Sequence, residues 1–124
     1  MIIAVGIDII EVERIRNLLE QSERFRQRVF TDTEQAYCSP KKNAALSYAA
    51  RFAAKEAFLK ALGTGLSEGL SYKDIEVVND KKGKPELILY AKAKEMVVRK
   101  GAKAWHVSLS HLQELAAAVV ILEK

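Results

Sequence analysis

The stretch AALSYAARFAAKEAFLKAL, residues 44–62, decides the fold that this sequence predicts. Asn43 precedes it as a side chain that can cap a helix start. Gly63 or Gly65 follows it and can adopt the left-handed conformation in which helices often end. Because the stretch is rich in alanine, neighbouring elements can pack close against it. These features predict one long central helix.

Two polar stripes run along this helix. At about 100° per residue, Arg51 and Lys55 lie on one side, while Glu56 and Lys60 lie nearly opposite. One stripe can face water, and the other then lies at an interface, at a cleft or on a second solvent face. Glu56 and Lys60 can also form a surface ion pair worth about 0.3–0.5 kcal/mol. Taken alone, the pattern favours that ion pair.

Shorter elements precede the long helix. Residues 2–10 read IIAVGIDII and are apolar on both alternating faces, which predicts a strand covered on both sides. An amphipathic helix follows and ends before Ser22. Thr31 and Glu34 have the spacing of a capping box, which opens a short helix that stops near Pro40.

The second half of the chain predicts mainly strands. Two hairpins are expected, with a helix between them. The whole chain therefore predicts an α+β fold in a single domain, with a mainly antiparallel sheet packed on the alanine-rich helix. The strands are expected at residues 75–79, 86–90, 105–110 and 115–122, the helix at residues 91–100, and the domain at residues 1–124.

Composition indicates an ordinary globular protein. Hydrophobic residues make up 49% and charged residues 29% of the 124 residues, which excludes a disordered or fibrous chain. No apolar stretch reaches the roughly 20 residues of a membrane span, and no secretory leader is apparent, so we expect a cytoplasmic protein. Cys38 is the only cysteine and is expected to be an unreactive thiol. The length is small for a two-substrate site, which favours a site shared between subunits.

The net charge of +4 and the pI of about 9.2 indicate an acidic partner. Nucleic acid, a membrane surface, a phosphorylated metabolite and an acidic protein all satisfy that description. Much of the positive charge is concentrated near residues 14–28, where a cluster of arginines most often marks a solvated face.

Asp8 is the unusual residue of the first strand. An ionised carboxylate without a partner would cost several kcal/mol among apolar neighbours. It can pair with an arginine or cap the next helix, and from this observation alone these interpretations have the better odds. If Asp8 and Glu56 converge, they supply two hard oxygen ligands for Mg²⁺, and Lys60 would reach a substrate phosphate. Such a site transfers a phosphoryl group without any enzyme nucleophile.

Four segments resemble a known family. The most specific is RFAAKEAFLKALGTG at residues 51–65, and the others are GIDI at residues 6–9 with Arg14-Ile15 after it, GKP at residues 83–85, and SLSH at residues 108–111. They resemble the holo-acyl-carrier-protein synthases, which are small 4′-phosphopantetheinyl transferases. The resemblance covers nearly the whole chain.

This resemblance implies an enzyme that moves the 4′-phosphopantetheine arm of coenzyme A to a serine of apo acyl carrier protein. The serine attacks the β-phosphate, adenosine 3′,5′-bisphosphate leaves, and the holo carrier supports fatty acid biosynthesis. The family further implies a homotrimer, with coenzyme A between adjacent subunits and Mg²⁺ on Asp8 and Glu56. Glu56, Asp8 or a metal-bound water can each take the serine proton, and the sequence leaves these three open.

The resemblance also implies roles for single residues. His111 is expected near the nucleotide phosphates, whereas a histidine at a hairpin turn is otherwise more often structural. The expected catalytic residues are Asp8, Glu56, Lys60 and His111, and the expected coenzyme A contacts are Arg51, Lys60, Gly83, Lys84, Pro85 and His111, with Gly83 to Pro85 beside the adenine.

A basic surface is expected to dock the carrier. Carrier proteins are acidic and helical, so positive charge near the metal site would steer them and orient their serine. Gln21 departs from the family pattern, because some relatives carry another arginine there. The expected docking residues are Arg14, Leu18, Arg24, Phe25 and Arg28.

Two other functions fit part of the sequence. A small basic nucleic-acid-binding module explains the pI, but the sequence has no zinc spacing, no RNA-binding aromatic pattern and no helix-turn-helix, and Asp8 has no role in it. A catalytically inactive homologue would be expected to have lost Asp8, Glu56 or Lys60. All three are present.

Overall fold

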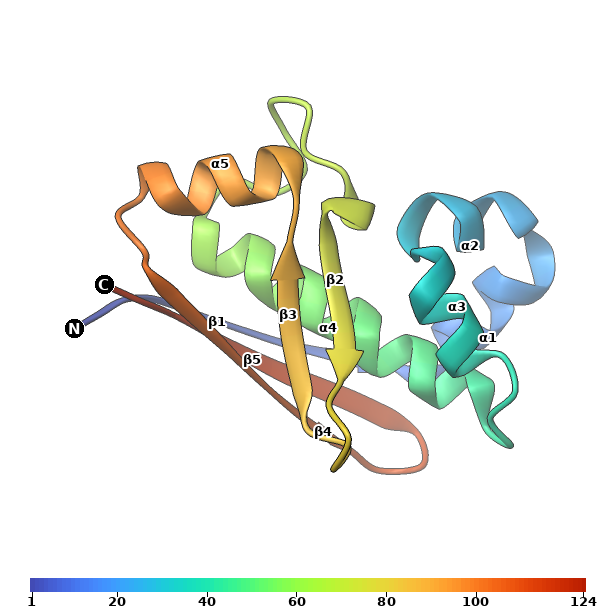
Figure 1. Ribbon diagram of the computed structural model, residues 1–124. Coiled ribbons are helices and arrows are strands. Elements are labelled where there is room, and N and C mark those ends of the chain that lie inside the picture. Colours follow the sequence, from blue (N-terminus) through green and yellow to red (C-terminus); the bar gives the residue numbers. More distant parts are fainter.

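The computed structural model describes all 124 residues and places the helix α4 (Ala44–Leu62) through the middle of the molecule (Figure 1). Its caps are the expected ones. Asn43 accepts a hydrogen bond from the Leu46 amide at 3.2 Å, and Gly63 takes a left-handed φ of 81°. The predicted long helix is therefore confirmed in extent and in both end signals.

Three short helices gather around the N-terminal end of α4 (Figure 1). The capping box predicted from Thr31 and Glu34 is present, with both of its hydrogen bonds formed. A second cap is supplied by Ser22, whose hydroxyl accepts from the Phe25 amide at 3.2 Å. The three helices are α1 (Val12–Gln21), α2 (Glu23–Val29) and α3 (Asp32–Cys38).

One face of α4 is covered by an antiparallel sheet in the order β1-β5-β4. Gly6 lies where β1 crosses the helix, and a Cβ atom at this position would stand only 1.9 Å from the Ala57 carbonyl oxygen. The strand therefore approaches the helix backbone directly beside Glu56. The strands are β1 (Ile2–Glu11), β4 (Ala104–His111) and β5 (Leu115–Glu123).

The outer face of β1 corrects one prediction. Val5, Ile7 and Ile9 are 56%, 67% and 65% exposed, so the single chain covers only the inner face of the strand. The same face of β5 adds Val119 and Ile121 opposite Ile7 and Val5. Coverage of β1 on both sides by this chain alone was therefore a wrong prediction. The apolar pattern of residues 2–10 has two causes: one face of β1 packs on α4, and the other face is an exposed apolar surface.

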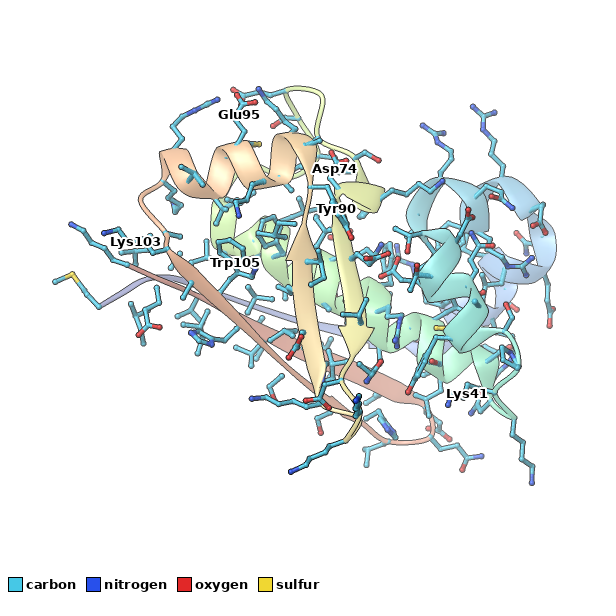
Figure 2. The ribbon with its side chains drawn as sticks, in the orientation of Figure 1. Lys41, Asp74, Tyr90, Glu95, Lys103 and Trp105 are labelled. Carbon is cyan, nitrogen blue, oxygen red and sulfur yellow. The ribbon has the colours of Figure 1, made fainter.

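A second, two-stranded sheet lies beside β4. Its strands are joined by the predicted polar turn, in which the Asp80 amide donates to the Lys84 carbonyl at 2.9 Å. The Trp105 indole donates to the Leu87 carbonyl at 3.1 Å and ties β4 to this hairpin (Figure 2). The elements are the short 3-10 helix η1 (Tyr72–Asp74), β2 (Ile75–Asn79), β3 (Pro85–Leu89) and α5 (Ala91–Arg99).

Candidate active site

Asp8 lies on the inner face of β1 and forms an ion pair with Lys60 of α4. The Lys60 Nζ donates to the Asp8 Oδ1 at 2.9 Å, and the Asp8 side chain is 15% exposed. Capping of α1 is not the role of this carboxylate, because Glu11 occupies the N-cap without a side-chain cap bond. Pairing with an arginine does not occur either. The partner of Asp8 is the lysine that the sequence had placed near a phosphate.

Glu56 does not form the surface ion pair with Lys60 that its spacing favoured. Its Oε1 accepts a hydrogen bond from the Tyr72 hydroxyl at 2.5 Å, and both side chains are half-buried. Burial, followed by the hydrogen bond and the charge of Glu56, raises the pKa of Tyr72 above its ordinary value. The phenol therefore remains a protonated donor at neutral pH.

These four residues, Asp8, Glu56, Lys60 and Tyr72, form what we call the carboxylate cluster. The negative charges of Glu56 and Asp8 both raise the pKa of the Tyr72 phenol, while the nearby Arg14 guanidinium opposes them. Both carboxylates therefore act on one tyrosine, although they are far apart in the sequence. Gly6 of β1 meets α4 at Ala57, next to Glu56, so the two carboxylates come from adjoining parts of one chain, and their joint binding of a metal ion stays a prediction.

The donor chemistry of the carboxylate cluster fits a hard divalent ion. Asp8 and Glu56 each use one carboxylate oxygen in a side-chain hydrogen bond, which leaves the other oxygen of each without a side-chain partner. No group of three or more histidine, cysteine, aspartate or glutamate side chains is arranged to hold a metal. A two-carboxylate set without further protein ligands suits Mg²⁺, which keeps waters and substrate phosphates in its remaining positions.

A buried ion pair lies next to the cluster and was missed by sequence reasoning. Lys55 and Glu34 are both fully buried, and the Lys55 Nζ donates to the Glu34 Oε1 at 2.7 Å. Burial lowers the pKa of Lys55, and the carboxylate of Glu34 opposes that change. The remaining partners are backbone groups: Lys55 donates to the carbonyls of Val29 at 2.6 Å and Tyr72 at 3.1 Å, and Glu34 accepts from the amides of Thr31 at 2.9 Å and Val77 at 2.8 Å.

Most of the expected coenzyme A contacts lie in a separate hollow of about 420 Å³, which we call the basic hollow. Arg51 is only 3% exposed, donates to the Asn79 side chain at 2.5 Å, and lies 4.3 Å above the Tyr37 ring. Lys84 lines a neighbouring hollow instead, beside Trp105. The basic hollow is lined by Tyr37, Lys41, Asn43, Leu46, Ser47, Ala50, Arg51, Asn79, Gly83, Pro85, Leu109 and His111.

In a single chain the basic hollow and the carboxylate cluster are not joined. None of Asp8, Glu56 and Lys60 lines the basic hollow. The structure thus brings three of the four expected catalytic residues together and leaves His111 with the residues that are expected to contact coenzyme A.

Four of the five expected docking residues line one groove of about 600 Å³, which we call the α1–α2 groove. Arg14 is the exception, and its charge acts on Tyr72 instead. Tyr72 itself lines the groove, which connects the groove with the carboxylate cluster. The lining residues are Leu18, Ser22, Arg24, Phe25, Arg28, Val29, Phe52, Leu66, Leu70, Ser71 and Tyr72.

Comparison with known proteins identifies the family. The model of the 4′-phosphopantetheinyl transferase superfamily matches residues 4–120. The chain belongs to this superfamily. Among curated transferases, it is 52% identical to the holo-[acyl-carrier-protein] synthase of Geobacter sp. (strain M21), with 100% of each chain covered. It is 50% identical to the same enzyme of Geobacter metallireducens, with 100% of this chain and 99% of the relative covered.

Solved structures of transferases of this superfamily share the fold. A holo-(acyl-carrier-protein) synthase of Bacillus anthracis, in complex with CoA (3′,5′-ADP), matches with a TM-score of 0.83 and 41% identity over 99% of this chain and 97% of that one. The Neisseria meningitidis enzyme matches with a TM-score of 0.90 and 32% identity over the whole of both chains. The predicted family resemblance and the α+β fold are therefore confirmed. None of the helices combines the length and apolar character that a membrane crossing requires.

Proposed function

We propose that this chain is a holo-[acyl-carrier-protein] synthase, which transfers 4′-phosphopantetheine from coenzyme A to a serine of apo acyl carrier protein. The observation that carries the proposal is the carboxylate cluster, which stands at the edge of a groove with basic and apolar walls. A nucleic-acid-binding module would leave this cluster without a role. The product carrier would serve fatty acid biosynthesis, and a cytoplasmic location stays a prediction.

Asp8 and Glu56 would hold Mg²⁺, which neutralises charge on the pyrophosphate of coenzyme A when it is bound. Lys60 has a 55% exposed side chain, so its ammonium could turn from Asp8 to bind a phosphate oxygen of the substrate. The serine proton needs an acceptor, and Tyr72 is excluded because its raised pKa keeps it a donor. Within the chain, the carboxylates of Glu56 and Asp8 are the candidate acceptors of that proton.

The nucleotide part of coenzyme A would lie in the basic hollow of a neighbouring subunit. Arg51, Lys41 and His111 offer it positive charge or hydrogen bonds to phosphate, and Gly83 with Pro85 forms a wall without charge. The separation of this hollow from the carboxylate cluster in one chain supports a shared site. The exposed apolar face of β1 supports the same assembly, which the family resemblance makes a homotrimer.

The carrier would dock on the α1–α2 groove. Arg24 and Arg28 supply the charge that attracts an acidic helix, and Leu18, Phe25 and Phe52 supply apolar contact. Because Tyr72 lines the groove and bonds Glu56, a serine presented there would arrive beside the carboxylate cluster.

The direct test is to incubate the protein with coenzyme A, Mg²⁺ and apo acyl carrier protein, and to weigh the carrier by mass spectrometry. A gain equal to one phosphopantetheine arm is expected, and an unchanged carrier mass would overturn the proposal. Asp8→Ala and Glu56→Ala should each abolish the gain while circular dichroism still reports a folded chain, since neither residue belongs to the core. Normal turnover in either variant would end the metal assignment.

A further inference from the structure

We propose that Tyr72 is a positioning residue for the transfer reaction: its hydroxyl holds one oxygen of Glu56 so that the other oxygen faces the divalent ion. The inference rests on the proposed function of the same site. The Tyr72 hydroxyl donates to the Glu56 Oε1 at 2.5 Å, and no other side chain bonds this carboxylate. Tyr72 comes from η1 and Glu56 from α4, so the contact joins two separate elements.

Glu56 needs such a partner because its side chain is long and only half-buried. Lys60, one helical turn further on, is engaged with Asp8 and does not hold Glu56. Carboxylates that bind metals are usually hydrogen-bonded by a second residue that fixes their orientation, and loss of that residue typically weakens metal binding about 10–100-fold. Tyr72 has the donor chemistry and the position for this role.

Tyr72 is itself held from α4. The buried Lys55 ammonium donates to the Tyr72 carbonyl at 3.1 Å, and Lys55 immediately precedes Glu56 in the helix. The Tyr72 ring packs on Phe52, with centroids 5.6 Å apart. Two consecutive residues of α4 therefore contact Tyr72: Lys55 bonds its backbone carbonyl, and Glu56 bonds its hydroxyl. No step of the transfer uses the buried Lys55–Glu34 pair. We assign it the role of holding the Tyr72 backbone in place.

The chain contains a matched control. Tyr90 also donates its hydroxyl to a glutamate, Glu76 Oε1, at 2.8 Å, but it stands at the end of β3 (Figure 2). It lines neither the basic hollow nor the α1–α2 groove and lies outside the carboxylate cluster. Tyr72→Phe and Tyr90→Phe each remove one oxygen atom from a tyrosine–glutamate contact. They differ in whether that glutamate belongs to the site.

The experiment measures Mn²⁺ binding by electron paramagnetic resonance in the presence of coenzyme A, for the wild type and both variants. Tyr72→Phe should weaken Mn²⁺ binding at least about tenfold, whereas Tyr90→Phe should bind like the wild type. In the mass assay, Tyr72→Phe should need more Mg²⁺ for half-maximal transfer. Its KM for carrier should change less than about twofold, because the ring still lines the groove.

Equal Mn²⁺ affinity in Tyr72→Phe and wild type would overturn the inference, as would an equal loss in both variants. A rise in carrier KM without a change in metal affinity would also overturn it and would make Tyr72 a docking residue. Failure of the proposed function is distinguishable, because it appears as a wild type that leaves the carrier mass unchanged, whatever the variants bind.

Discussion

Gly6→Ala should separate the two carboxylates without touching either. The added Cβ would lie 1.9 Å from the Ala57 carbonyl oxygen and 2.7 Å from the Ala61 amide nitrogen, both of which are backbone atoms that cannot turn aside. Ordinary contact begins at 3.4 Å, so β1 has to move away from α4 by about 1.5 Å, the difference between 1.9 and 3.4 Å. Asp8 is two residues from Gly6 and Glu56 precedes Ala57, so this displacement acts on the site directly.

The substitution should affect both the free energy of unfolding and the rate of transfer. Overpacking of this kind typically costs about 1–3 kcal/mol of unfolding free energy. A displacement near 1 Å can cost about 100-fold in rate, and metal–oxygen distances tolerate only about 0.2 Å. We therefore expect a folded, moderately destabilised protein whose kcat/KM for transfer is at least about 100-fold lower.

The assay combines the rate of carrier mass gain with urea unfolding. Gly101→Ala is the matched control, because Gly101 has a φ of 98° with no atom near its added Cβ, and an alanine there costs about 1–2 kcal/mol of strain in a turn away from the carboxylate cluster. That variant should lose stability and keep its rate. Gly6→Ala with near-wild-type kcat/KM would refute the link between the β1–α4 crossing and the site.

Three further predictions concern buried and charged groups. Lys55→Met should lower the free energy of unfolding by about 3–5 kcal/mol in urea melts, because it leaves the buried Glu34 charge without a partner. Adding Glu34→Gln to this variant should recover part of the loss. A Lys55→Met variant as stable as the wild type would contradict this. Arg28→Glu should raise the KM for carrier protein, and this rise should be smaller at high salt, where charge is screened. The KM for coenzyme A should stay unchanged. An unaltered KM for carrier would exclude the α1–α2 groove as the docking site. Burial raises the pKa of the Cys38 thiol, so iodoacetamide at pH 8 should label it only after unfolding, and prompt labelling of the native protein would disprove its burial.

Local signals explain why the elements could be predicted from sequence. The Thr31–Glu34 capping box, the Asn43 cap and the Gly63 terminator each act within a few residues, so they fix helix ends wherever the helix packs. The strands of both hairpins alternate or run apolar between turn residues, and their observed ends differ from prediction by at most one residue. The hydrophobic periodicity and the capping residues were therefore sufficient to predict the helices and strands.

Long-range partners could not be read in the same way. Lys55 and Glu34 are 21 residues apart, and the sequence places Lys55 in a polar stripe without telling that its ammonium is fully buried. Glu56 showed an i, i+4 lysine, which is a common surface pair, yet its partner is Tyr72. The partner of a long polar side chain depends on how separate elements pack, and spacing carries no information about that.

The candidate site could be predicted only in part from the sequence. Asp8 in an apolar strand signalled that a cation was near, but the residues alone favoured an arginine or a helix cap. The residues alone left the convergence of Asp8 with Glu56 and Lys60 conditional, and only the family resemblance made it an expectation. The close approach of Gly6 to Ala57 now gives the physical reason for that neighbourhood.

The proposed mechanism requires Asp8 and Glu56 to bind one divalent ion against the pyrophosphate of coenzyme A. A crystal grown with coenzyme A and Mn²⁺ tests it through the anomalous signal of the manganese. We expect one strong peak within about 2–2.3 Å of an oxygen from each carboxylate and next to the pyrophosphate. A peak that touches neither carboxylate, or coenzyme A bound with the two carboxylates empty and apart, would contradict it.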